Sequence, residues 1–205
     1  MDRFEKLNIL ITGPAGAGKS TVLDILHGFD LDEFGYRFPH SDPAQWLIST
    51  EIVEYRIRET DLEGEGPINY YGGLCSNMRG LVNCPSWDGF IVLVPTPPTL
   101  YRNLLNRQAP DRDDTHILEL LDTEEGVRNY VQLWHYDMPR WLGSVAKTVL
   151  ICYGETDSIF DIIDVISGMN WDAGKDVGVV GAHFPLAHPP YTVDGDDYIY
   201  QAGLN

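Results

Sequence analysis

Runs of apolar residues alternate with amphipathic stretches along most of this chain. Three runs are continuous enough to predict strands buried on both faces, and they cover residues 7–12, 89–94 and 147–153. After the first run, apolar residues recur at helical spacing over residues 22–26, up to Gly28. Buried strands that alternate with amphipathic helices predict an α/β fold, with a parallel sheet between two layers of helices.

Weaker patterns indicate the remaining elements of a sheet of about five strands. Short strands are expected at residues 36–38 and 68–71. In one expected helix, Ile48, Ile52 and Tyr55 form the apolar face. Capping residues and apolar stripes predict helices at residues 43–59, 97–107, 123–142 and 159–166. The pattern is lost from Asn170 onward, which predicts a domain of residues 1–169 and an irregular, extended C-terminal tail of residues 170–205.

The segment between the first strand and its helix carries the strongest chemical signal. Residues 13–20 read Gly-Pro-Ala-Gly-Ala-Gly-Lys-Ser and match the pattern G-x-x-x-x-G-K-S of a P-loop. Its glycines let backbone N–H groups face phosphate oxygens, and the helix that begins at Lys19 adds the positive end of its dipole. Lys19 supplies a charge to the β- and γ-phosphates, and Ser20 supplies a hydroxyl ligand for Mg²⁺. We therefore predict a site for ATP, or another nucleoside triphosphate, with Mg²⁺. The expected nucleotide-binding residues are Gly13, Pro14, Ala15, Gly16, Ala17, Gly18, Lys19, Ser20 and Thr21.

The order of parts from Phe90 to Ile166 resembles that of nucleoside and nucleotide monophosphate kinase-like proteins of the P-loop superfamily. A viral, phage-type origin of this chain is compatible with that resemblance. In that group a buried strand leads to a helix with arginines, a mobile lid, a long helix, a last strand and a closing helix. The resemblance implies a lid at residues 108–116, whose closure brings arginines to the transferring phosphoryl group. It also implies that an aspartate after the second strand accepts a proton from the substrate hydroxyl. The candidate catalytic residues are Lys19, Asp42, Arg102, Arg107 and Arg112.

These roles have structural alternatives. Arg102 and Arg107 could pair with aspartates of the following loop, where surface ion pairs contribute about 0–1 kcal/mol. Asp42 precedes a proline at a helix start, which is also the usual place of an N-cap. Kinases of this group usually carry a carboxylate near Mg²⁺ at the tip of the strand before the lid-bearing part, and Tyr70-Tyr71-Gly72-Gly73 offers none. Asp88 precedes its strand and is expected to be a turn residue.

The expected activity is ATP-dependent phosphoryl transfer to a nucleoside, a nucleotide or a related small hydroxyl or phosphate acceptor. A GTPase-like or ATPase switch is the first alternative, although only Asp157 matches the N-K-x-D pattern expected after the last strand. A structural or viral protein that binds nucleotide without turnover is the second. A kinase that acts on modified bases in DNA is the third.

Charge bears on the choice between these partners. The 31 acidic and 14 basic residues give a formal net charge of -17. Such a surface repels long polyanions, so a nucleic-acid partner is disfavoured unless Arg37, Arg56, Arg58 and Arg79 form a local basic strip. A free nucleoside or nucleotide is therefore the preferred acceptor.

Other features bear on location and assembly. No apolar run is long enough to cross a membrane and the N-terminus lacks a signal-peptide layout, so we expect a cytoplasmic protein, in the host cytoplasm if viral. Three cysteines without C-x-x-C spacing indicate buried free thiols. Tyr191, Tyr198 and Tyr200 leave two placements open for the tail: along its own domain, or against a neighbouring subunit of a homo-oligomer.

Overall fold

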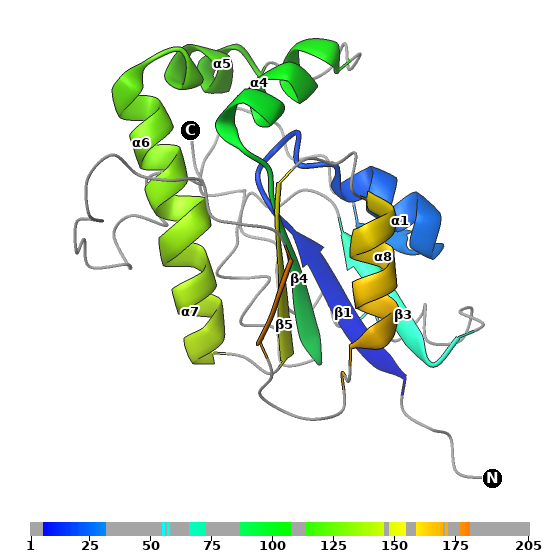
Figure 1. Ribbon diagram of the computed structural model, residues 1–205. Helices are drawn as coiled ribbons and strands as arrows, with labels where there is room; N and C mark the ends of the chain where they lie inside the picture. Colours follow the sequence, from blue (N-terminus) through cyan, green and yellow to red (C-terminus); the bar gives the residue numbers. More distant parts are fainter. Residues whose placement is uncertain are drawn as a thin grey trace, which may run out of the picture.

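One parallel sheet forms the centre of the molecule. The computed structural model describes residues 6–31, 55, 57, 66–72, 87–107, 114–145, 148–154, 159–169, 171 and 177–180. Within these residues the sheet has six strands in the order β2-β3-β1-β4-β5-β6, and all neighbours run parallel. The central strands β3, β1, β4 and β5 can be followed in Figure 1. The strands are β1 (Leu7–Thr12), β2 (Phe29–Asp30), β3 (Ile68–Gly72), β4 (Gly89–Val94), β5 (Thr148–Tyr153) and β6 (Val177–Val180). All carboxyl ends therefore meet at one edge of the sheet, which is where parallel α/β folds bind ligands.

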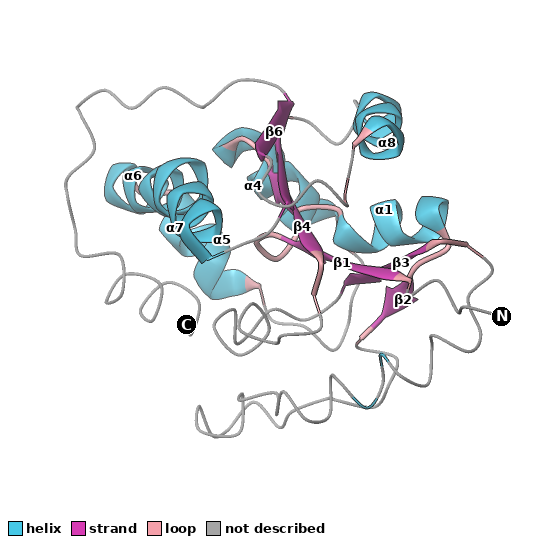
Figure 2. Ribbon diagram, turned by 90° about the horizontal axis from the view of Figure 1, so that it is seen from below, coloured by secondary structure: helices cyan, strands magenta, loops and turns pink. Residues whose placement is uncertain are grey.

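Helices cover both faces of the sheet. They are α1 (Lys19–Leu26), α4 (Pro97–Asn106), α5 (Thr115–Leu121), α6 (Glu124–Val131), the π-helical segment η2 (Gln132–Asp137), α7 (Met138–Val145) and α8 (Ile159–Gly168). Helices α1 and α8 lie on one face, and α6, η2 and α7 lie on the other (Figure 2). This is the three-layer α/β fold of P-loop proteins that the sequence predicts. None of the helices in the described part of the chain has the length and apolar character that a bilayer span requires.

The core consists of two apolar layers, one on each face of the sheet. In β4, Phe90 and Val92 belong to one layer, while Ile91 and Leu93 belong to the other. Every residue of β4 and β5 is buried. A strand buried on both faces is apolar at nearly every position, which explains why these two runs were readable in the sequence.

Asp88 lies at the amino edge of the sheet, away from the carboxyl ends. Its Oδ2 accepts a hydrogen bond from the Asn8 N–H at 2.8 Å, and its own N–H donates to the Asn8 carbonyl oxygen at 2.8 Å. These two bonds join the starts of β1 and β4. Asp88 therefore lies at the edge opposite the carboxyl ends, as its place before the strand predicts, while its assignment to a turn stays a prediction.

The second strand and the helix after it differ from the prediction. The strand that follows α1 is β2 at Phe29–Asp30, and the expected strand at residues 36–38 lies outside the described residues. Tyr55 and Ile57 are helical, as expected. However, Tyr55 is 58% exposed whereas Ile57 is 3% exposed and belongs to the core. The assignment of Tyr55 to the apolar face is therefore wrong.

Two further differences concern the later half of the chain. The long helix expected at residues 123–142 is present, but its middle is the π-helical segment η2, and it continues to Val145. The expected irregular tail contains a sixth strand, because β6 pairs with β5. Trp171 is also buried in the core and donates a hydrogen bond from Nε1 to the Ile166 carbonyl oxygen at 3.3 Å. Other residues of 170–205 lie outside the described residues, so the boundary between domain and tail stays a prediction.

Candidate active site

The P-loop (residues 13–20) follows β1 directly and is held between β4 and α4. Gly16 and Gly18 have φ angles of +79° and +87°, which side chains rarely allow. A Cβ on Gly16 would lie 2.9 Å from Cδ2 of Leu104, and a Cβ on Gly13 would overlap the carbonyl oxygen of Leu93. Conformation and close approach therefore both require glycine in this loop.

Hydrogen-bond donors converge inside the P-loop. Lys19 Nζ donates to the carbonyl oxygens of Gly13 at 3.0 Å and Pro14 at 2.8 Å. The backbone N–H of Ala17 donates to the same Pro14 oxygen at 3.2 Å. Helix α1 begins at Lys19 with no side-chain cap, so the positive end of its dipole faces the loop. An ammonium, a backbone N–H and a helix N-terminus form a donor set that fits a phosphate group.

Ser20 and Thr21 lie in the first turn of α1, and both are exposed. A hydroxyl at this position can ligate a cation that also binds phosphate oxygens. Among the described residues, no group of three or more His, Cys, Asp or Glu side chains could hold a metal by itself. Mg²⁺ is commonly bound by one or two protein ligands together with phosphate oxygens.

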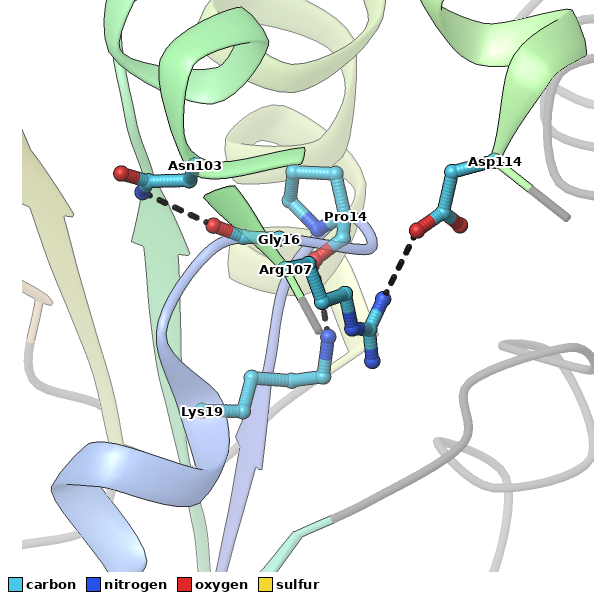
Figure 3. A network of polar contacts seen from close by, with 6 residues as sticks. All are labelled: Pro14, Gly16, Lys19, Asn103, Arg107 and Asp114. Atoms are coloured by element: carbon cyan, nitrogen blue, oxygen red, sulfur yellow. Dashed lines mark hydrogen bonds and ion pairs between the residues drawn. The ribbon is translucent and has the colours of Figure 1, made fainter. Parts of the chain in front are cut away.

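Helix α4 packs against the P-loop from the other side. Thr96 caps its N-terminus by accepting a hydrogen bond from the Thr99 N–H at 3.4 Å, which confirms the predicted start of this helix. Leu100 and Leu104 are buried against Gly16. Asn103 Nδ2 donates to the Gly16 carbonyl oxygen at 3.0 Å (Figure 3). No pattern in the sequence indicates a role for Asn103.

The predicted arginines are placed unequally by the structure. Arg107 follows α4 directly and pairs with Asp114, with 3.4 Å between Nη1 and Oδ2 (Figure 3). Their side chains are 27% and 16% exposed, so this pair is partly shielded from water. Arg102 is exposed on α4. Arg112, Asp42 and residues 108–113 of the expected lid lie outside the described residues. The end of that lid is not a loop, because α5 begins at Thr115.

Asp30 is a carboxylate at the carboxyl edge of the sheet that the sequence analysis missed. It is the last residue of β2, opposite Gly72 of β3, while the neighbouring Tyr71 is opposite Leu10 of β1. Asp30 therefore ends its strand close to the level at which β1 enters the P-loop. Asp32 follows two residues later in the sequence but lies outside the described residues. Two aspartates separated by one residue, soon after the P-loop helix, are the signal that could have identified this position.

A second group of polar side chains is buried around η2. Gln132 Nε2 donates to Asp137 Oδ1 at 2.8 Å, and within the described part of the chain Asp137 Oδ2 is buried without a hydrogen-bond partner. Burial raises the pKa of the Asp137 carboxyl, while the hydrogen bond from Gln132 and the charge of Arg140 lower it by less. The ring of His135 stacks on Tyr153, with 5.2 Å between ring centroids. The stacking contact joins η2 to the end of β5.

The expected buried thiol is confirmed for Cys152. It is 3% exposed and free, and burial raises the pKa of its thiol to about 12. A thiol with so high a pKa is unreactive at neutral pH. Cys75 and Cys84 lie outside the described residues.

Comparison with known proteins gives one informative match. No family model and no solved structure matches the chain. Over 140 residues, the chain is 31% identical to a shikimate kinase of Pseudoalteromonas translucida (strain TAC 125), and the match covers 62% of this chain and 77% of that protein. Together with the sheet order and the P-loop, this identity defines a P-loop kinase, rather than a GTPase-like switch or a nucleotide-binding protein without turnover. The chain belongs to the shikimate kinase family. A phage-type origin and a location in the cytoplasm stay predictions.

Proposed function

We propose that this kinase transfers the γ-phosphoryl group of ATP to a hydroxyl group of a small acceptor molecule, with Mg²⁺. The observation that carries the proposal is the convergence of Lys19 Nζ and the Ala17 N–H inside the P-loop, at the N-terminus of α1. These donors can bind the β- and γ-phosphates, and Ser20 can ligate Mg²⁺. In the reaction, the acceptor oxygen forms a bond to the γ-phosphorus and the bond to the β–γ bridging oxygen breaks.

Two aspartates are candidates for the carboxylate that the reaction needs. Asp30 ends β2 at the carboxyl edge of the sheet, where it could accept the proton of the acceptor hydroxyl or ligate Mg²⁺. Asp42 remains the candidate from the sequence. Asp30 would approach the P-loop from the β2–β3 side of β1.

Arginines would contribute during closure around the phosphates. Arg107 follows α4, the helix that packs against the P-loop, and in this proposal it would exchange Asp114 for the transferring phosphoryl group. Together with Arg102 and Arg112 it would stabilise negative charge in the transition state. The part of the expected lid that precedes α5, residues 108–114, would exclude water from the reaction.

The acceptor is a small hydroxylated molecule in this proposal. A relative is a shikimate kinase, which supports a compact acceptor with hydroxyl groups. The net charge of -17 disfavours polymeric DNA as the acceptor. Free nucleosides and nucleotides therefore belong in the same trial as shikimate and other small polyols.

An acceptor screen tests the proposal. ADP release from ATP with Mg²⁺ would be measured with shikimate, related polyols, nucleosides, nucleotides and short oligonucleotides. We expect one class of small hydroxylated compounds to raise ADP release and to appear as a phosphate ester by mass spectrometry. Lys19→Met should abolish this turnover, whereas Lys6→Met, just before β1, should leave it unchanged. ATP binding without transfer to any small acceptor would contradict the proposal, and transfer to oligonucleotides would replace it with the DNA alternative.

A further inference from the structure

Asn103 joins α4 to the P-loop across 87 residues of sequence. Its Nδ2 lies 3.0 Å from the carbonyl oxygen of Gly16 and donates a hydrogen bond to it. The neighbouring Leu100 and Leu104 side chains cover the same side of Gly16. Beside these apolar side chains, the partly buried carbonyl oxygen of Gly16 would lose a partner if Asn103 were removed, and a shielded carbonyl without a partner is unfavourable.

This hydrogen bond also decides where the next N–H group points. The C=O and N–H groups of a planar trans peptide point in opposite directions. Because Asn103 holds the carbonyl oxygen of Gly16 toward α4, the N–H of Ala17 points into the loop, where it donates to Pro14 at 3.2 Å. Lys19 Nζ donates to that same oxygen at 2.8 Å. The orientation of one peptide thus places two donors at one point inside the loop.

Gly16 cannot fix this peptide by itself. It has a φ angle of +79°, and glycine populates both signs of φ, so the peptide after it can rotate more easily than one between larger residues. Helix α4 is fixed at its start by the Thr96 cap and by Pro97. The amide of Asn103 therefore extends from a helix with a capped start and holds the Gly16–Ala17 peptide, which Gly16 alone does not fix.

We propose that Asn103 is a positioning residue for phosphate binding, which orients the Gly16–Ala17 peptide so that the Ala17 N–H can donate to a phosphate oxygen. The inference rests on the proposed ATP site and deepens it. In this proposal α4 contributes to binding of the phosphate groups, and it does not contribute to binding of the base or the acceptor. Its signature is a loss of affinity for phosphate-bearing nucleotides alone.

The test compares ADP with adenosine in calorimetry and competition assays. Asn103→Leu keeps the size of the side chain and removes the donor. We expect ADP to bind about five-fold more weakly or worse, as loss of one hydrogen bond of ordinary strength implies, while the affinity for adenosine is unchanged. In steady-state assays the KM for ATP should rise and the KM for the acceptor should not. Asn103→Ser, which shortens the side chain without adding bulk, should give the same pattern.

Asn106→Leu is the matched control, because Asn106 is exposed at the end of the same helix. It should leave ADP affinity unchanged. Equal ADP affinity in Asn103→Leu, Asn103→Ser and the parent would overturn the inference, and so would an equal loss for ADP and adenosine. If the parent itself binds ADP no better than adenosine, the proposed ATP site fails instead, and the two failures are thereby distinguished.

Discussion

Asp30 illustrates how much a single residue depends on the sheet around it. As the last residue of a two-residue strand, it brings a carboxylate to the edge at which the P-loop begins. A base that accepts a proton acts only in turnover, whereas a Mg²⁺ ligand also affects binding of the metal with nucleotide. Kinetics can therefore separate the two roles.

We expect Asp30→Asn to lower kcat by about 100-fold or more if Asp30 accepts the proton, because general bases contribute about 10²–10⁴-fold to rate. ATP affinity with Mg²⁺ should then be unchanged. If Asp30 ligates Mg²⁺, the concentration of Mg²⁺ needed for half-maximal activity should rise as well. Asp24→Asn, on the exposed side of α1, is the control for loss of one negative charge. Full activity of Asp30→Asn would leave Asp42 as the candidate carboxylate.

Asp137 is a residue-scale feature that affects stability instead of chemistry. Its side chain is 8% exposed, and burial raises its pKa above the ordinary value of 3.8. The folded protein therefore binds this proton more tightly than the unfolded chain does. By linkage, this group makes stability fall as the pH rises from about 3.8 through the raised pKa of the folded state.

Asp137→Asn should remove that pH dependence, because asparagine does not titrate. The melting temperature of the variant relative to the parent should increase as the pH is raised from 3 to 7, since only the parent must then bury a charge. Thermal unfolding at a series of pH values measures this difference. A constant difference between the two proteins over that range would contradict the assigned pKa shift, and Asp24→Asn provides the baseline for an exposed carboxylate.

At the scale of elements, the junction between α5 and α6 requires a glycine. Thr123 Oγ1 donates to the Leu120 carbonyl oxygen at 2.9 Å and accepts from the Gly126 N–H at 3.0 Å. A Cβ on Gly126 would overlap that same carbonyl oxygen of Leu120. The Leu120 carbonyl group in the turn before α6 therefore leaves no space for a side chain at Gly126.

Gly126→Ala should destabilise the protein by about 1–3 kcal/mol, because the backbone of the turn must shift. This is opposite in sign to the gain of about 1 kcal/mol that alanine usually gives inside a helix. Gly168→Ala is the control, since the last residue of α8 has open space around its Cβ position and should gain up to about 1 kcal/mol. Urea unfolding of both variants measures the two effects, and a stabilised Gly126→Ala would show that the junction relaxes freely.

The elements that were predicted well from the sequence are those whose own residues form a recognisable local pattern. Continuous apolar runs identified β1, β4 and β5, and the Thr96-Pro97 pair identified the start of α4. The two-residue β2 is too short for any pattern. The four-residue β6 is defined by its pairing with β5, and the π-helical segment η2 packs on the end of β5 through the stacking of His135 on Tyr153. Such features depend on tertiary neighbours, which a local pattern does not contain.

The same distinction holds for the site. The P-loop was predicted because glycines, a lysine and a serine at fixed spacing are needed for phosphate binding in any sequence context. Asn103 has no such spacing, since its contact with Gly16 exists only after α4 has packed on the loop. The sequence contains several aspartates that could pair with Arg107. Only the folded structure identifies Asp114 as the partner.

For the whole molecule, the acidic surface is the dominant electrostatic feature. A net charge of -17 on 205 residues makes the compact state repel itself, and dissolved salt screens this repulsion. We expect the melting temperature to rise by about 2–4 °C or more between 0.05 and 1 M KCl, which for this size corresponds to about 1 kcal/mol. Choline chloride at equal ionic strength should act similarly if screening is the cause. A melting temperature that does not change with either salt would show that repulsion between the acidic groups is already offset in the folded protein.

The walls of the P-loop come from parts of the chain that are synthesised much later than the loop itself. Gly13 lies against Leu93 of β4, and Gly16 lies against Leu100 and Leu104 of α4. Between the loop and these walls, the ribosome must also make β3, which pairs with the other side of β1. A growing chain therefore has the glycine-rich segment long before it has a phosphate site. During translation, nucleotide can stabilise only those chains whose first half, through α4, has already emerged and folded.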